Sequence, residues 1–176
     1  THYVRTALRK LLGKRVTVST VYDICHNIGK KERHTIHGRD KNVLVHRKGA
    51  TRAFGPHMQD MPDHYKGTGH PVLIPGTMGT SSYVMVGTRD NQAFNSCCHG
   101  AGRVMSRRKA RQTVDIQHLE NTLDHYEVTV QAGSEKGVLE EAPQAYKEVQ
   151  NVVNAVSCAH LARPVTRMVP RIVLKG

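Results

Sequence analysis

The segment around His99 combines a potential nucleophile with a loop of the kind that binds phosphate. It reads Cys98-His99-Gly100-Ala101-Gly102-Arg103. Small residues let backbone N–H groups approach a phosphate closely, and a helix beginning after them would add a favourable dipole. We expect that helix over residues 101–112, with Arg103 and Arg107 on one face. Tight-turn packing explains Gly-Ala-Gly about as often, but the neighbouring His and Arg residues favour attack on phosphorus, or metal binding, by His99.

Three other segments contain residues suited to a phosphate, a nucleotide or a metal. Residues 75–82 (Pro-Gly-Thr-Met-Gly-Thr-Ser-Ser) offer glycines and hydroxyls that suit a nucleotide or an ordinary turn. His26, within Asp-Ile-Cys-His-Asn, could bind Mn, Zn or Fe, although a single surface histidine is the commoner explanation. Residues 46–52 (His-Arg-Lys-Gly-Ala-Thr-Arg) suit RNA phosphates or form a solvated loop.

The elements that position these segments follow from the spacing of the apolar residues. This spacing predicts one helix that ends at Gly13 and another that begins after an N-cap at Asp115. A third helix is expected over 143–161, with Pro143 in its first turn. Strands are expected over 15–25, 42–46, 71–74, 82–86, 127–130 and 165–174, the last interrupted at Pro170, and an irregular stretch over 47–69. Because helices and strands do not alternate regularly, the predicted fold class is α+β, in one domain over 1–176.

Composition favours a polyanionic partner. The formal net charge is +12, with twelve His in addition, which favours nucleic acid over a basic surface kept for solubility. Aromatic residues make up 5% and Trp is absent, which argues against a base-stacking surface. No apolar run approaches the roughly eighteen residues of a membrane span, and the four Cys form no CxxC pair. We therefore expect a soluble cytoplasmic protein that contacts phosphates and no membrane.

Six segments, in this order, resemble the RtcB family of GTP-dependent RNA ligases. They are Tyr22-Asp23-Ile24-Cys25-His26-Asn27, His46-Arg47-Lys48-Gly49-Ala50-Thr51-Arg52-Ala53-Phe54, Pro71-Val72-Leu73-Ile74-Pro75-Gly76-Thr77-Met78-Gly79, His99-Gly100-Ala101-Gly102-Arg103-Val104-Met105-Ser106-Arg107, Glu140-Glu141-Ala142-Pro143-Gln144-Ala145-Tyr146-Lys147 and Leu174-Lys175-Gly176. The resemblance runs from about Val21 to Gly176 and implies the C-terminal part of the family's catalytic domain.

The resemblance implies a role for each matching residue. His99 corresponds to the histidine that is guanylylated, and His26 to a ligand of one of two Mn²⁺ ions. Lys48 and Arg107 correspond to basic side chains that hold RNA phosphates. The residues implied to bind the guanylate are Asn27, Pro75, Gly76, Thr77, Met78, Ser82, Gly100, Ala101 and Gly102, with Tyr146 and Lys175 at the guanine base.

The implied reaction joins an RNA end bearing a 3′-phosphate or a 2′,3′-cyclic phosphate to a 5′-hydroxyl end. It uses GTP and Mn²⁺, acts on tRNA halves or broken RNA, and often involves an archease-like activator. Family members are longer, and their N-terminal part carries most metal ligands, so we expect a fragment completed by that part or by a second chain. Two alternatives are a non-catalytic module that binds guanine nucleotide or RNA, and a metal-dependent phosphohydrolase.

Overall fold

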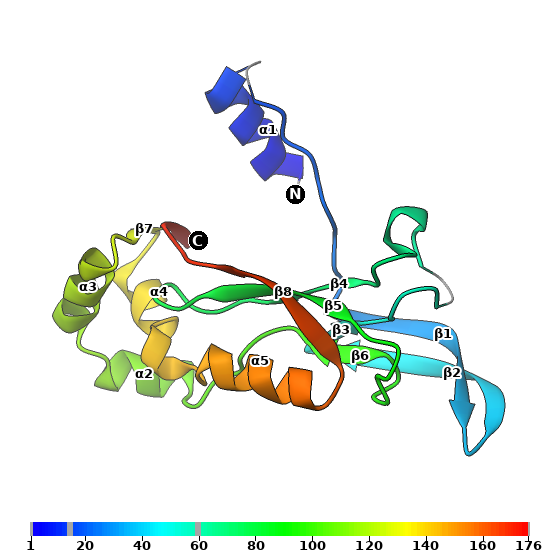
Figure 1. Cartoon of the computed structure of the whole chain (residues 1–176). Helices are drawn as coiled ribbons and strands as arrows, with labels where there is room; N and C mark the ends of the chain where they lie inside the picture. The colour runs from blue at the N-terminus through cyan, green and yellow to red at the C-terminus, as the bar shows by residue number, and fades with distance from the viewer. Residues whose placement is uncertain (1, 14–15, 59–60, 176) are drawn as a thin grey trace.

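The computed structural model describes residues 2–13, 16–58 and 61–175 and has an α+β fold (Figure 1). Helix α1 (His2–Leu12) ends at Gly13 as predicted, because Gly13 has the positive φ of +67° that glycine adopts readily at a helix end. The strand predicted over 15–25 is wrong: residues 16–25 have no regular structure, and Arg15 lies outside the described residues. The β-branched residues there have no partner strand, and β propensity acts mainly through cross-strand packing.

The first strand is instead part of a long hairpin. Strands β1 (Asn27–Ile36) and β2 (Arg39–Lys48) pair antiparallel along their whole length, with Asn27 opposite Lys48. The connecting pair His37-Gly38 has positive φ at both residues, as a tight two-residue hairpin turn requires. The predicted strand 42–46 is therefore confirmed but is longer, and Figure 1 shows the hairpin extending away from the other elements.

The stretch expected to be irregular, 47–69, contains ordered pieces. It includes the end of β2, the strand β3 (Ala50–Arg52) and a 3-10 turn over Asp63–Tyr65. Strand β3 pairs antiparallel with β6 (Ser96–Cys98), which the sequence did not predict. Both strands are only three residues long, so neither has an apolar alternation long enough to recognise.

The main core lies between a three-stranded sheet and one helix. Strands β4 (Pro71–Ile74), β5 (Ser82–Gly87) and β8 (Ala162–Met168) form the sheet, and α5 (Val149–Cys158) packs its buried valines against it. The helix predicted over 143–161 thus begins late. Pro143–Ala145 is a 3-10 turn, and Tyr146 is extended, with φ −120° and ψ 158°, because it pairs with Arg103 across an isolated bridge.

A second core holds the remaining elements together. Helix α3 (Ile116–His125) buries Leu119 and Leu123 against Met78, and its N-cap is Asp115 as predicted, accepting a hydrogen bond from the His118 N–H at 3.1 Å. The strand predicted over 127–130 lies two residues later, as β7 (Thr129–Ala132), and pairs parallel with β9 (Ile172–Lys175). The tail is interrupted at Pro170 as expected, while α4 (Glu135–Glu140) was not predicted.

The helix expected over 101–112 begins only at Arg107. Helix α2 (Arg107–Thr113) is capped by Ser106, whose side chain accepts from the Lys109 N–H. Arg103 therefore does not share a helical face with Arg107, and no helix dipole acts at the glycines before it.

No helix within the described ranges is long and apolar enough to cross a bilayer, and all four cysteines are free thiols.

Candidate functional site

His99 is positioned by three neighbouring backbone segments. It follows β6, and its N–H donates to the Gly49 carbonyl at 3.3 Å, while the Gly49 N–H donates to the His26 carbonyl at 3.0 Å. The imidazole rings of His26 and His99 consequently stack, with centroids 4.1 Å apart and planes 17° from parallel. The fold thus brings together two histidines that the sequence places far apart.

The surroundings of His99 favour the neutral imidazole. Partial burial lowers its pKa, and the adjacent His26 lowers it further because two imidazolium rings would repel each other. A neutral imidazole keeps the nitrogen lone pair that a nucleophile needs. His99 is therefore suited to nucleophilic attack at neutral pH.

A hollow of about 580 Å³ opens beside His99. That volume lies within the range typical of small-molecule sites. Its lining contains most of the predicted pocket residues, namely Pro75, Gly76, Thr77, Met78, Gly100, Ala101, Gly102, Tyr146 and Lys175. Gly49, Glu141, Val173 and Leu174 complete it. The parallel pairing of β7 and β9, which sets Ala132 beside Lys175, fixes the strand that delivers the lysine.

Five predicted site residues lie outside this lining, among them His26, whose ring stacks on that of His99. Ser82 stands behind the loop, where its Oγ accepts the Gly76 N–H at 3.0 Å. Asn27 and Lys48 face each other at the base of the hairpin, and both are exposed. The Arg107 side chain is 67% exposed and its Nε lies 3.6 Å from Glu141. These residues adjoin the hollow without forming its wall.

The loop after β4 is held by its own hydroxyls. The Thr77 N–H donates to Thr80 Oγ1 at 2.8 Å, and the Gly79 N–H donates to Thr77 Oγ1 at 3.3 Å. At Gly76, a Cβ atom would lie 2.1 Å from the Ser81 carbonyl oxygen, so only glycine fits there. The threonine hydroxyls that suggested nucleotide contacts therefore accept hydrogen bonds from the backbone of their own loop.

Glu141 connects the basic residues on one side of the hollow. Its carboxylate accepts a hydrogen bond from the Tyr146 hydroxyl and lies 3.5 Å from Lys175 Nζ and 3.4 Å from Arg103 Nη1. Burial raises the pKa of Glu141, but the Tyr146 hydrogen bond and the nearby cations together lower it below its usual value. Sequence analysis gave Glu141 no role, although it lies within one of the six segments.

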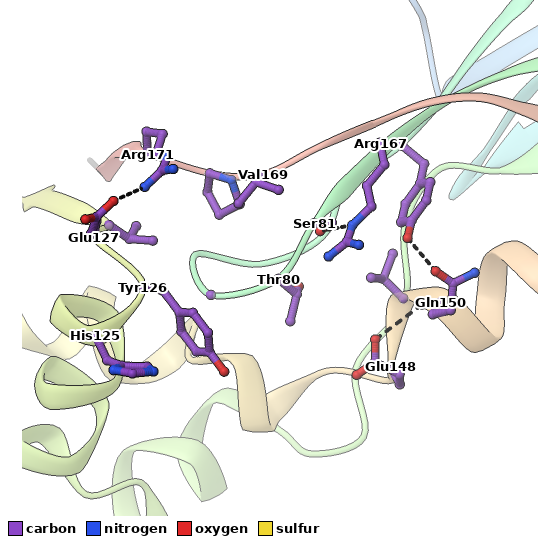
Figure 2. A pocket seen from close by; sticks show the side chains of 15 residues that line it. Thr80, Ser81, His125, Tyr126, Glu127, Glu148, Gln150, Arg167, Val169 and Arg171 are labelled. Carbon is purple, nitrogen blue, oxygen red and sulfur yellow. Dashed lines mark hydrogen bonds and ion pairs between the residues drawn. The ribbon is translucent and has the colours of Figure 1, made fainter.

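A second hollow, of about 540 Å³, lies on the side of the same loop formed by Gly79, Thr80 and Ser81 (Figure 2). Its lining contains none of the predicted site residues, and several of its polar side chains are paired with one another. Arg167 Nε donates to Ser81 Oγ at 2.7 Å, and Arg171 pairs with Glu127 at 2.5 Å. The hollow beside His99 is therefore the better candidate.

Comparison with known proteins decides the family. A family model described as tRNA-splicing ligase RtcB matches residues 1–176.

This chain belongs to the RtcB family.

Its similarity to individual RtcB proteins is high but covers only part of them. It is 46% identical over 181 residues to the tRNA-splicing ligase RtcB of Pyrococcus abyssi, a match that covers 100% of this chain and 20% of that protein. The RtcB proteins of Archaeoglobus fulgidus and Thermococcus kodakarensis are 42% and 45% identical, with 37% and 38% of their lengths covered. The chain thus spans well under half of each relative.

The metal site implied by the RtcB resemblance is not formed by the described residues. Within the described ranges, no three His, Cys, Asp or Glu side chains gather closely enough to hold a metal ion. The near-parallel stacking of His26 on His99 adds a second argument, because the in-plane lone pairs of two stacked rings do not converge on one ion. The residues present therefore do not fit a two-manganese centre.

Proposed function

We propose that this chain is the guanylate-binding, nucleophile-carrying part of an RNA ligase that uses GTP. The observation that carries the proposal is the position of His99, a histidine with a lowered pKa, at the edge of a 580 Å³ hollow walled by glycines and loop residues. Membership of a tRNA-splicing ligase family supports the reaction class.

In the first step, a ring nitrogen of His99 attacks the α-phosphorus of GTP. An N–P bond forms, the bond to the bridging oxygen breaks, and pyrophosphate leaves. The glycines 100 and 102 present backbone without side chains beside His99, and no protein atom approaches the free side of Gly102 within 4 Å, which leaves space for the phosphate. Tyr146, Glu141 and Lys175 then face the base end of the nucleotide.

In the next steps, the RNA supplies both reacting oxygens. An oxygen of the RNA 3′-phosphate attacks the phosphorus on His99, which regenerates the imidazole and activates the RNA end as a guanylylated phosphate. The 5′-hydroxyl of the second RNA end then attacks the RNA phosphorus and releases GMP. Lys48 and Arg107, both exposed beside the hollow, supply positive charge for these phosphates. The proposed substrates are tRNA halves or broken RNA.

A second candidate function is guanine-nucleotide or RNA binding without catalysis. The specific observation in its favour is the absence of a metal-ligand cluster within the described ranges. In the ligase proposal, Mn²⁺ ligands come from the longer part of an RtcB protein or from a second chain, and an archease-like activator assists. The two candidates differ in whether a covalent adduct forms.

The deciding experiment is incubation with α-labelled GTP and Mn²⁺, followed by denaturation and counting of the protein-bound label. The ligase proposal expects a label that acid removes and alkali does not, as a phosphoramidate behaves. His99→Ala must abolish it, whereas His125→Ala, which alters an exposed histidine in the other hollow, must leave it unchanged. GTP binding without any label would refute the covalent mechanism for this chain and support the binding function.

A further inference from the structure

The β1–β2 hairpin is strongly basic. Between Asn27 and Lys48 it contains seven Lys and Arg, namely Lys30, Lys31, Arg33, Arg39, Lys41, Arg47 and Lys48, against Glu32 and Asp40. Figure 1 shows it reaching away from the rest of the fold. The role proposed for His99 does not account for so much charge along one extended arm.

Strand geometry divides the hairpin into two faces. We call one the outer face: Asn27, Gly29, Lys31, Arg33 and Thr35 of β1, with Lys48, His46, Leu44, Asn42 and Asp40 opposite them. All ten of these described residues are exposed. The alternating positions face inward and include the buried residues Glu32, His34 and Arg47.

Of the inner-face cations, Arg47 is already neutralised. Glu32, whose side chain is fully buried, pairs with Arg47 at 2.8 Å and Arg52 at 2.9 Å, and lies 3.0 Å from His34. Arg47 also donates to Ser96 Oγ and to the Phe94 carbonyl. This cluster fixes the hairpin to the elements around β6 and occupies the Arg47 guanidinium. The other inner-face cations, Lys30, Arg39 and Lys41, are exposed.

The outer face differs from the inner face in its continuity with Lys48, and one of its described cations pairs with an anion. Arg33 pairs with Asp40 at 2.8 Å. Among the described residues, no carboxylate lies within ion-pair distance of Lys31 or Lys48. Leu44 is the single large apolar side chain among the described outer-face residues, so the face offers charge rather than an apolar contact. This composition fits a phosphate chain better than a protein groove or a lipid surface.

The outer face leads directly into the site. Lys48 precedes Gly49, whose carbonyl accepts the His99 N–H. Lys31 lies opposite Leu44, four residues along β2 from Lys48, which corresponds to about 14 Å, and Arg33 is about 7 Å further. We propose that the outer face binds the phosphate backbone of the RNA strand whose end lies at His99. This inference rests on the proposed function and extends it from the reacting ends to the body of the RNA.

The test is fluorescence anisotropy of a labelled single-stranded RNA of about 20 nucleotides with a 3′-phosphate, measured over a range of salt concentrations. Lys31→Ala should weaken binding about fivefold and reduce the salt slope by about 0.7, the value for one phosphate contact on a single strand. Lys31→Glu, which leaves the Arg33–Asp40 pair intact, should weaken it more. A dinucleotide with the same end should bind both variants as well as it binds the unaltered chain, because it is too short to span the roughly 14 Å from Lys48 to Lys31.

The matched control is Lys30→Ala, which removes the same charge from the adjacent, exposed position on the opposite face. Equal losses for Lys30→Ala and Lys31→Ala would overturn the proposal in favour of unspecific attraction to a basic arm. Unchanged affinity for the long RNA in the Lys31 variants would also overturn it, and would leave the face to a protein or membrane partner. The His99 adduct needs no RNA. Loss of the adduct alone therefore refutes the proposed function, and loss of the Lys31 effect alone refutes this inference.

Discussion

The buried carboxylate of Glu32 should be among the most sensitive charged positions in the chain. It faces two guanidinium groups: the Arg47 side chain is 1% exposed and the Arg52 side chain 14%. Replacing Glu32 with Gln keeps the size and one acceptor oxygen but leaves both arginines without their counter-charge. Asp40→Asn provides a matched control, because the Arg33–Asp40 pair has the same 2.8 Å separation in the same hairpin but is 64% and 48% exposed.

The expected magnitudes differ because burial differs. Removing one partner of a buried ion pair costs about 3–5 kcal/mol of unfolding free energy, whereas an exposed pair contributes about 0–1 kcal/mol. At a denaturant dependence of about 2 kcal/mol per M, Glu32→Gln should lower the urea midpoint by about 2 M. Asp40→Asn should lower it by less than about 0.5 M. If the N–O distance alone determined the contribution of an ion pair, the two variants would lower the urea midpoint equally.

Urea unfolding at neutral and acidic pH would test this reasoning. Burial raises the pKa of Glu32, but hydrogen bonds from Arg47 and His34 and the arginine charges lower it below its usual value. The stabilisation is therefore complete above the unfolded pKa of about 4.3 and disappears as the pH falls through the folded value. The difference between the unaltered chain and Glu32→Gln should shrink accordingly. Equal midpoint shifts for the two variants at neutral pH would show that the Glu32 cluster does not hold the hairpin.

Three further predictions concern the site and its support. Gly76→Ala should lower the unfolding free energy by about 1–3 kcal/mol, because the new Cβ would lie 2.1 Å from a backbone oxygen. Gly100→Ala is the control: the nearest atom to its Cβ would be 3.9 Å away, so thermal unfolding should change little. Glu141→Gln should weaken GTP binding about tenfold in calorimetry, because Tyr146 and Lys175 lose the charge that orients them, and unchanged affinity would contradict that role. Burial and the charge of Arg52 lower the pKa of His70 to about 4, so folding should lose stability, by up to about 3 kcal/mol, as the pH falls from about 6.5 to 4. A His70→Gln variant should lack that pH dependence in the same urea titration.

Local patterns in the sequence predicted the elements whose ends are marked by side-chain chemistry. Asp115 caps α3 through its own carboxylate, and Pro71–Ile74 is an apolar run bounded by turn residues. The predictions that were wrong concern residues whose conformation depends on a partner distant in the sequence. Tyr146 has a sequence context suited to helix but is extended, since Arg103 bridges to it and the Lys147 N–H donates to the Gly102 carbonyl. No local periodicity contains that information.

The same distinction explains what could be predicted of the site. His99, its glycines and the loop after β4 were recognisable because each forms a contiguous segment. Glu141 was not, because its importance arises only when β9 brings Lys175 to it and the bridge at Arg103 turns Tyr146 toward it. Its carboxylate contacts Tyr146, Arg103 and Lys175, which come from separate segments of the chain. The role of such a residue can be recognised only from the structure. The contacts of Glu141, more than the glycine loop, are therefore the part of the site that the sequence did not predict.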